Sequence, residues 1–501
     1  MKRIILAFIF SLTSSIPAQS QFQQFINYVN SLSDSSEKAA AVDSFMNYAV
    51  TQGIPFIEDS TANFIYRGNI NTLTVAGDFN GWSATSRPLL KLSGTNFWYR
   101  SELFEMDARL DYKFVLNDST WILDPRNLNT CAGGFGPNSE LSMPDYVQPW
   151  EIEFYPNIQH GTILTRNIFS INVNTNYQLN IYLPPGYDSL SSMTYPTVYF
   201  QDGIEYISLG RAVNVLDNLI DSGKIKTVIG VFVRPNNRND EYAGSKRNQY
   251  RMFFVDELVP YIDSLFKTKR DANQRLVLGD SFGGNISALI SYNHPEVFGL
   301  CGLHSAAFWP NNYEAYNLIT TGPVKEIKWS SIWGTYESLF TNMRLFRDFL
   351  IANNYKIDWL EQPEGHSWGL WRATLDNMLE YFFPAQPSFV EDDQNIFVSD
   401  FELYQNYPNP FNPSTMIQFV IPNEVRNLRD FSSQAPRNNN TFATLKVYDL
   451  LGREVATLIN EEKSAGGYKV NFDASQLPSG VYYYRLQAGD LSQTKKMVLL
   501  K

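Results

Sequence analysis

One short glycine-containing segment constrains the fold of this chain more than any other. Gly279–Gly283 has the sequence G-D-S-F-G, follows an apolar stretch of strand character (275–278) and precedes a helical pattern over 284–290. Small residues two before and two after the serine permit a sharp turn that lifts its hydroxyl above a sheet and directs backbone N–H groups at the same place. A G-x-S-x-G between a strand and a helix is typical of a nucleophile elbow. We therefore expect Ser281 to be a nucleophile.

A serine hydroxyl needs a base to take its proton, and the chain has four histidines. His160 precedes the predicted core strands, and His294 closes the helix after the elbow, where an imidazole usually caps carbonyls. His304 ends the next predicted strand and is a weaker alternative. His366 lies in a turn-like loop and comes last in the chain, as the order serine, acid, histidine requires. We predict that His366 is the base.

The acid should lie between these two residues, at the end of a strand. Glu337 directly follows a predicted strand over 328–334. Asp348 is its rival, but it falls on the expected solvent face of a helical pattern, and Asp358 lies inside the following strand. We predict that Glu337 orients the histidine; the alternative is a solvated loop carboxylate.

Five segments between residues 178 and 383 resemble one enzyme family in sequence and order. They are Tyr199–Gly203, Arg238–Tyr242, Asp256–Asp263, His294–Gly299 and Gly365–Trp368. The resemblance is to the putative-esterase family of the α/β-hydrolase fold, which includes the esterase D, feruloyl esterase and enterochelin esterase groups. It implies a three-layer domain with a mostly parallel sheet and a reaction that needs no cofactor.

The same resemblance gives Ser281, His366 and Glu337 the positions of nucleophile, base and acid. Many members have aspartate as the acid, so Glu337 departs from the pattern; glutamate can do the same work if the loop accommodates one more methylene. Activity on esters would then follow the serine-hydrolase route, through an acyl-enzyme.

The resemblance also implies where the oxyanion and the substrate lie. The oxyanion hole would be formed by backbone N–H groups of Phe282 and of Gly203 or Ile204. The loops around the pocket contribute a further set of candidate side chains, namely Asp202, Glu205, Arg238 and Trp309.

Length and composition limit the possible functions. A chain of 501 residues is too long for one core and suggests three domains plus processing segments. A formal net charge of −11 argues against a nucleic-acid or anionic-membrane surface. Cys131 and Cys301 fall in different predicted domains, so we expect no disulfide framework. The four histidines are scattered, so we propose no metal.

The N-terminus has the pattern of an export signal. Two basic residues precede an apolar stretch over 4–12, which is too short to span a bilayer. We predict a signal peptide over 1–18 and no membrane-spanning segment in the chain.

Residues 19–60 have helical periodicity, and 61–146 have the short alternating strands of a sandwich. Three segments, Val75–Trp82, Tyr112–Val115 and Trp121–Pro125, resemble the family 48 carbohydrate-binding modules, which have an immunoglobulin-like early-set fold. The resemblance implies that Trp82, Lys113 and Trp121 contact a glycan. The alternative is a module that only packs on its neighbour.

Strands and helices then alternate over 147–385, the domain assigned to the hydrolase. The candidate strands are 177–183, 197–201, 227–233, 275–278, 300–304, 328–334 and 356–362.

A proline-containing acidic stretch over 386–400 indicates a linker, and a β-rich pattern occupies 401–501. Segments such as Tyr404–Pro413, Val447–Val455 and Leu477–Tyr482 resemble the C-terminal (Por) sorting domain of type IX secretion substrates. The resemblance implies a small sandwich that engages outer-membrane secretion machinery. Residues 423–440 interrupt its pattern, and we predict a disordered loop insertion there.

Together these features predict a secreted or cell-surface serine carboxylesterase of a Gram-negative-type bacterium, acting on esters attached to polysaccharide, such as feruloyl or acetyl xylan. A siderophore esterase of the enterochelin type is the alternative substrate class. The alternative of another class is a catalytically inactive surface protein that binds carbohydrate. The order of elbow, acid and histidine favours the enzyme.

Overall fold

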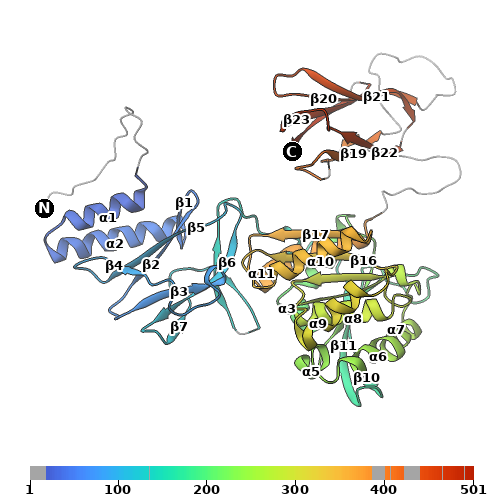
Figure 1. Ribbon diagram of the computed structural model, residues 1–501, viewed down its shortest axis with the longest axis horizontal. Helices are drawn as coiled ribbons and strands as arrows, with labels where there is room; N and C mark the ends of the chain where they lie inside the picture. Colours follow the sequence, from blue (N-terminus) through green and yellow to red (C-terminus); the bar gives the residue numbers. More distant parts are fainter. Residues whose placement is uncertain are drawn as a thin grey trace. The chain divides into compact units, whose positions relative to one another are not determined.

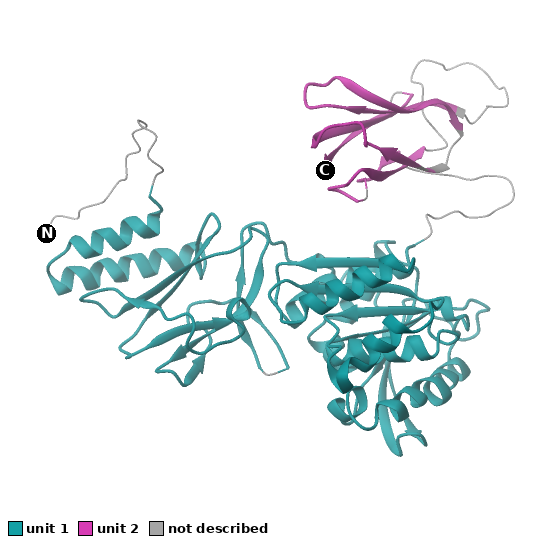
Figure 2. Ribbon diagram, in the orientation of Figure 1, with its two compact units in different colours: residues 1–385 teal, residues 386–501 magenta. Residues whose placement is uncertain are grey.

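The computed structural model describes residues 19–134, 136–385, 401–406, 408–421, 440–464, 466–489 and 491–500. The chain forms two compact units, residues 1–385 and 386–501 (Figure 2). The predicted signal peptide and linker lie outside the described residues, as does all but the last residue of the predicted insertion. Within the described ranges, no helix combines the length and apolarity that crossing a membrane requires.

Two helices begin the described chain, α1 (Gln21–Ser31) and α2 (Ser35–Gln52) (Figure 1). Asp34 caps α2, since its carboxylate accepts hydrogen bonds from the backbone N–H groups of Ser36 and Glu37. Apolar residues of both helices share one core with the sheet beside them; the rings of Phe25 and Phe45 stack 4.0 Å apart. The helices therefore cover the outer face of that sheet.

The next domain is a sandwich of two antiparallel sheets (Figure 1). One has the order β1 (Phe56–Glu58), β2 (Thr61–Arg67), β5 (Phe97–Leu103), β4 (Leu90–Lys91). The other has the order β3 (Leu73–Gly77), β6 (Arg109–Leu116), β9 (Asn138–Ser142), β8 (Thr130–Cys131), with β7 (Thr120–Ile122) beside β6 and the short helix η1 (Asp78–Asn80) after β3. Phe64 from the first sheet and Val75 and Phe114 from the second lie in one core between them.

An eight-stranded sheet forms the centre of the third domain. Its order is β10 (Thr162–Ser170), β11 (Thr175–Leu183), β13 (Ile229–Val233), β12 (Thr197–Phe200), β14 (Arg275–Asp280), β15 (Leu300–His304), β16 (Lys328–Gly334), β17 (Lys356–Gln362). The strands from β13 to β17 are parallel, and β10 and β11 are antiparallel additions at one edge. All seven strands expected from the sequence form, and β10 is an eighth that the sequence did not indicate.

Helices cover both faces of this sheet, because successive strand residues point to opposite sides. Val198 and Phe200 pack in one core with α4 (Ala212–Asp221) and α11 (Trp368–Phe382). Tyr199 packs in the opposite core with the helices that cover the other face. Those helices include α7 (Val259–Leu265), α8 (Phe282–Asn293), α9 (Pro310–Thr321) and α10 (Phe340–Ala352).

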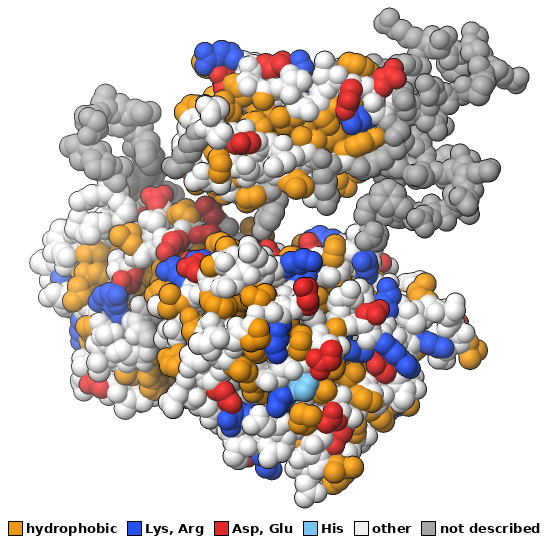
Figure 3. Space-filling view, turned by 45° about the vertical axis from the view of Figure 1, so that its right-hand side comes forward, with side chains coloured by type: hydrophobic (Ala, Val, Ile, Leu, Met, Phe, Trp, Pro, Cys, Tyr) orange, Lys and Arg blue, Asp and Glu red, His pale blue; other side chains and the backbone are white. Residues whose placement is uncertain are grey.

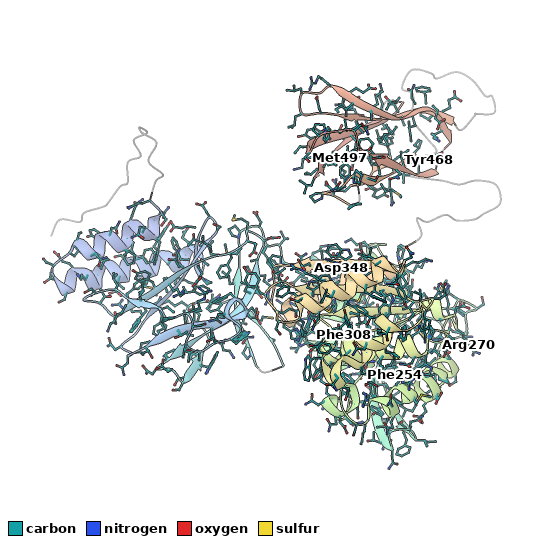
Figure 4. The ribbon with its side chains drawn as sticks, in the orientation of Figure 1. Phe254, Arg270, Phe308, Asp348, Tyr468 and Met497 are labelled. Atoms are coloured by element: carbon teal, nitrogen blue, oxygen red, sulfur yellow. The ribbon has the colours of Figure 1, made fainter. Side chains whose placement is uncertain are left out.

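The remaining helices of this domain are short. They are η2 (Trp150–Ile152), α3 (Gly203–Ser208), α5 (Arg238–Tyr242), α6 (Arg247–Met252), the π-helical turn η3 (Phe253–Leu258) and η4 (Ala272–Gln274). Phe254 of η3 and Phe308 before α9 both lie in the core of the α8 face (Figure 4).

The second unit is a smaller sandwich (Figures 1 and 4). Its sheets have the orders β18 (Glu402–Leu403), β19 (Ser414–Ile421), β22 (Gly466–Asp473) and β21 (Glu454–Ser464), β20 (Asn440–Tyr448), β23 (Gly480–Ala488), β24 (Leu491–Leu499). Phe419 from the first sheet and Met497 from the second lie in one core, and Tyr468 stacks on Phe419 with ring centres 5.3 Å apart. All of its strand pairs are antiparallel.

On the face that Figure 3 shows, acidic and basic side chains are interspersed rather than gathered by sign. The net negative charge of the chain is therefore not concentrated in one acidic patch on this face.

Candidate active site

Ser281 occupies a sharp turn between β14 and α8. Its backbone has φ +52° and ψ −115°, a conformation that costs free energy in a residue with a Cβ. Three hydrogen bonds hold it: the Ser281 N–H donates to the His304 carbonyl at 2.9 Å, and the Ser281 carbonyl accepts from the N–H groups of Ala307 at 2.9 Å and Asn285 at 3.2 Å. The surrounding structure therefore maintains a strained residue with a half-buried side chain.

The glycines of this turn are required by close packing. A Cβ on Gly279 would lie 2.5 Å from the carbonyl carbon of Gly283, and a Cβ on Gly284 would lie 2.8 Å from the Cβ of Ala306. Real Cβ atoms do not approach so closely, so the first turn of α8 can fold back on β14 only with glycine at these positions. The turn therefore has the geometry that its sequence predicted.

Two sets of free backbone donors begin at the same edge of the sheet. Phe282 is the first residue of α8, and Gly203 and Ile204 begin α3. The N–H groups of a first helical turn have no acceptor within their own helix. Because β12 and β14 are parallel neighbours, with Phe200 paired to Leu278, the helices that follow them start side by side. The three candidate oxyanion donors thus lie where helix N-termini favour negative charge.

Glu337 and His366 are in direct contact. The Oε2 atom of Glu337 lies 2.5 Å from Nδ1 of His366, and its Oε1 accepts a hydrogen bond from the Gly334 N–H at 3.2 Å. The Glu337 side chain is fully buried, whereas that of His366 is 36% exposed. The carboxylate is therefore fixed in place while part of the imidazole stays accessible.

The sheet topology explains this meeting. Glu337 follows β16, His366 follows β17, and these strands are adjacent and parallel, with Gly334 paired to Gln362. Ser281 follows β14 of the same parallel sheet. All three residues thus lie beyond the carboxyl ends of parallel strands, where open α/β sheets bind their ligands.

Arg238 links the two loops that carry the candidate oxyanion donors. Its Nη2 lies 2.7 Å from Oδ2 of Asp202 and donates to the Asp280 carbonyl at 3.2 Å. Its guanidinium carbon lies 5.7 Å from the centre of the Phe282 ring. Burial raises the pKa of both aspartates, against the opposing effect of the Arg238 charge. Asp202 is buried, so its carboxylate supports the loop from inside the domain.

Trp309 and Glu205 have more open positions. Trp309 is 53% exposed and meets the Phe282 ring edge-on, with ring centres 5.0 Å apart. Glu205 is partly buried on α3, and its Oε2 has no hydrogen-bond partner within the described structure. The Trp309 ring therefore forms an exposed aromatic wall beside Phe282 at the elbow.

The other histidines have different environments. His304 is completely buried between the Tyr206 hydroxyl, 2.9 Å from Nδ1, and Thr374, and burial lowers its pKa to about 3. His160 contacts Asp217, and His294 contacts Arg251 and Glu296.

The alternative acids also lie elsewhere. Asp348 lies on α10 (Figure 4), where its largely exposed carboxylate contacts Arg347. Asp358 lies within β17.

The predicted glycan contacts lie on the sandwich. The indole rings of Trp82 and Trp121 lie face to face with their planes inclined by 28° and their centres 6.4 Å apart, and Trp121 is 42% exposed. The indole N–H of Trp82 donates to Oδ1 of Asp78 at 3.0 Å. Strand register puts Lys113 on the same side of the sheet as Val115 and its partner Trp121.

One acidic cluster in the described residues has the spacing of metal ligands, Glu151 with Asp376 and Glu380. The ammonium group of Lys224 lies 3.2 Å from Glu151 and 3.0 Å from Glu380. A cation from the chain itself therefore already pairs with two of these three acidic residues.

Two aromatic residues of the site were missed from the sequence. Trp371 packs edge-on against His366, with ring centres 5.0 Å apart, and the Tyr242 hydroxyl accepts a hydrogen bond from the Asp202 N–H at 2.9 Å. Tyr242 lies in a segment that carried the family resemblance. No sequence motif marks Trp371, because its contact with His366 depends on how α11 packs against the sheet.

The mostly parallel sheet with helices on both faces is an α/β fold, and two parts of the chain match families of known proteins. Residues 170–382 match the family described as putative esterase. Residues 405–500 match the family described as a secretion system C-terminal sorting domain. These two parts of the chain therefore resemble known families, and the sorting domain is that of a secreted or cell-surface protein.

Two curated relatives match parts of the chain. An endo-1,4-beta-xylanase/feruloyl esterase of Xylanibacter ruminicola is 35% identical over 229 residues, 43% of this chain and 31% of that protein. An uncharacterized protein of Bacillus subtilis is 32% identical over 146 residues, 28% of this chain and 60% of that protein. The chain thus spans less than two thirds of the length of these relatives.

Solved structures share the fold over a longer part of the chain. The enterobactin esterase of Shigella flexneri has a TM-score of 0.55 at 19% identity and covers 64% of this chain and 92% of its own. The ferric enterobactin esterase of Salmonella typhimurium also has a TM-score of 0.55 at 19% identity, with 64% and 93% covered.

Proposed function

We propose that this protein is a serine carboxylic-ester hydrolase of the α/β-hydrolase fold, with Ser281 as nucleophile, His366 as base and Glu337 as acid. The observation that carries the proposal is the 2.5 Å contact between Glu337 and His366 at the sheet edge where Ser281 occupies its strained turn. A buried carboxylate that holds Nδ1–H leaves Nε2 as a proton acceptor.

The reaction then follows from these positions. Ser281 Oγ attacks the ester carbonyl as His366 takes its proton, and the developing oxyanion accepts hydrogen bonds from the N–H groups of Phe282 and of Gly203 or Ile204. His366 returns the proton to the leaving alcohol. Water then attacks the acyl-enzyme by the same route and releases the acid.

For the substrate we propose an ester attached to polysaccharide, such as a feruloyl or acetyl group on xylan. Two observations support it: the relative named as a xylanase/feruloyl esterase, and the exposed Trp309 beside Phe282, which offers an apolar wall to an aromatic acyl group. A siderophore lactone is the second candidate, supported by the fold shared with the enterobactin esterases.

For the flanking domains we propose an immunoglobulin-like carbohydrate-binding role for 61–146 and export through the outer membrane for 401–501. The neighbouring indole rings of Trp82 and Trp121 support the first, and the sorting-domain match supports the second. The signal peptide over 1–18 would direct the first stage of export, into the periplasm.

Hydrolysis of p-nitrophenyl acetate and methyl ferulate by the purified chain tests the enzyme proposal. We expect release of p-nitrophenol that Ser281→Ala abolishes. Ser287→Ala is the matched control, because Ser287 lies on the same helix and its buried hydroxyl has no hydrogen-bond partner in the described structure. A wild-type chain that is inactive on both esters, on acetyl xylan and on a catecholate lactone would favour the inactive surface protein.

A further inference from the structure

The sandwich contacts the loop that carries His366. Arg109, the first residue of β6, donates its backbone N–H to the Pro363 carbonyl at 3.2 Å, and it forms an isolated parallel bridge with Glu364. Strand β6 of the sandwich thus pairs with the backbone of the third domain at Pro363 and Glu364, directly before His366.

The Arg109 side chain holds the same loop on both sides of His366. Its Nη1 donates to the Ser367 hydroxyl at 3.1 Å and lies 3.5 Å from Oε2 of Glu364. Its Nη2 lies 2.6 Å from Asp111 and 2.8 Å from Glu140, and its Nε donates to Glu140 at 3.0 Å, so the rest of the guanidinium binds carboxylates of the sandwich. The guanidinium is completely buried, so its fork is fixed between sandwich and loop.

Glycines in the third domain make this approach possible. A Cβ on Gly365 would lie 2.0 Å from Cγ of Asp78, and a Cβ on Gly369 would lie 1.9 Å from Nη1 of Arg109. Asp78 is itself fixed, because its Oδ2 accepts a hydrogen bond from the Asp111 N–H at 2.7 Å. The loop and the start of α11 therefore fit against polar groups of the sandwich with no room for a side chain.

The sandwich also contacts the loop that carries Glu337. The Tyr336 hydroxyl donates to Oε2 of Glu105 at 2.5 Å, and its ring lies 6.2 Å from that of Phe104. The Tyr336 N–H donates to the Glu364 carbonyl at 3.0 Å, which ties the two loops together. Residues adjacent to both the acid and the histidine are thus bound to the sandwich.

Stability alone does not account for this cluster. Buried ion pairs usually contribute no more than well-packed apolar residues of similar volume, because desolvation offsets the attraction. Burial raises the pKa of Glu364 to about 7 even though the Arg109 charge opposes the shift. The cluster does fix the orientation of the groups bound to Arg109, because a guanidinium donates its hydrogen bonds in the plane of its fork.

We infer that the N-terminal sandwich positions the catalytic loops, and that Arg109 is the positioning residue which holds loop 363–367 so that His366 meets Glu337 and faces Ser281. This inference rests on the function proposed above. It gives Arg109 and Glu105 of the sandwich a positioning role, in addition to any glycan binding by residues 61–146.

Kinetics of the full chain test it. Arg109→Lys keeps the charge and loses the fork, and Tyr336→Phe loses only the hydroxyl that reaches Glu105. We expect kcat on p-nitrophenyl acetate to fall on the order of 10- to 100-fold in Arg109→Lys, with KM changed by less than about twofold, because a misplaced base affects the chemical step more than binding. Tyr336→Phe should have a smaller effect in the same direction.

Phe97→Leu is the matched control. Phe97 packs in the core that the sandwich shares with α1 and α2, so the substitution loosens the sandwich without touching either loop. It should lower the melting temperature and leave kcat unchanged. Folded Arg109→Lys and Tyr336→Phe variants with wild-type kcat would overturn the inference, as would an equal loss of kcat in Phe97→Leu.

A readout that needs no turnover separates this inference from the proposed function. In chains labelled with nitrogen-15 histidine, the Nδ1 proton of His366 should give a low-field signal, assigned by its loss in His366→Gln. We expect Arg109→Lys to broaden or shift it, and Phe97→Leu to leave it in place. An unchanged signal in Arg109→Lys overturns the inference whether or not the wild type hydrolyses esters. If Arg109→Lys does not fold, the His366 Nδ1 proton signal is measured in Tyr336→Phe and Glu364→Gln instead. An unchanged signal in both variants would overturn the inference.

Discussion

The Oε2 atom of Glu337 lies 2.5 Å from Nδ1 of His366, and the residues that fix these two side chains come from different parts of the chain. Glu337 is fixed by the Gly334 N–H of its own loop, whereas His366 is packed by Trp371 from α11. The contact exists because β16 and β17 are parallel neighbours, and its geometry is set by what packs around both loops.

Glu337→Gln should lower kcat by at least about 100-fold, since an amide no longer selects the tautomer that presents Nε2 to the serine. Thermal unfolding should change little, because the amide keeps the volume of the carboxylate. Initial rates on p-nitrophenyl acetate measure the effect. Asp348→Asn is the control and should be nearly silent, as its carboxylate is largely exposed on α10. The opposite pattern would exclude Glu337 as the acid.

Trp309→Ala should raise KM for methyl ferulate by about fivefold, as expected from loss of about 1 kcal/mol of ring contact. The KM for methyl acetate should change less, because its acyl group is too small to reach the ring. Tyr313→Ala provides the comparison, since Tyr313 is an exposed aromatic residue of the same segment. Equal effects of Trp309→Ala on both esters would argue that Trp309 supports the elbow instead.

The local parts of this structure could be predicted from the sequence. The elbow depends on five consecutive residues, and the central strands are continuous apolar stretches that are buried on both faces. β10 could not be predicted in this way, because it is an edge strand whose residues are mostly exposed and show no apolar alternation.

The site could be predicted in part. The order of Ser281, Glu337 and His366 in the chain indicated their roles, but Arg109 gave no signal, because its partner Glu364 is 255 residues away. Asp202 was expected at the pocket, and the structure places its buried carboxylate in an ion pair with the partly exposed Arg238. Whether a polar residue lines a pocket or supports it depends on side-chain packing that sequence order does not specify.

Export should remove both ends of the chain. In its native host, we expect the mature protein to begin near residue 19 and to end within the 384–400 region, because the sorting domain is removed or exchanged on passage through the outer membrane. Mass spectrometry of the culture medium and the cell surface measures both ends. A variant that lacks 401–501 should accumulate in the periplasm. Full-length chain in the periplasm of wild-type cells would contradict the prediction.

Trp121→Ala should weaken retention of the full chain in gels that contain xylan or soluble α-glucan. Its ring is the more exposed of the indole pair, and stacking on a sugar contributes on the order of 1 kcal/mol. Trp150→Ala is a control, since Trp150 is similarly exposed but lies on η2, outside the sandwich. Wild-type protein that migrates equally with and without polysaccharide would favour a purely packing role for the sandwich.

His304 should make the third domain sensitive to acid. Burial lowers its pKa to about 3, so the folded protein holds it neutral, whereas the unfolded chain binds a proton below about pH 6.5. Folding stability from this group is therefore complete above about pH 6.5 and falls by about 1.4 kcal/mol per pH unit as the pH decreases toward 3.

Urea unfolding of the full chain at pH 7 and pH 5, followed by tryptophan fluorescence, measures this contribution. His304→Gln can still bind the Tyr206 hydroxyl but takes up no proton, so between these pH values it should lose about 2 kcal/mol less stability than the wild type. A His304→Gln variant that lost as much folding stability between pH 7 and pH 5 as the wild type would contradict this prediction. Other groups would then account for the pH dependence, and His304 would take up its proton in the folded protein.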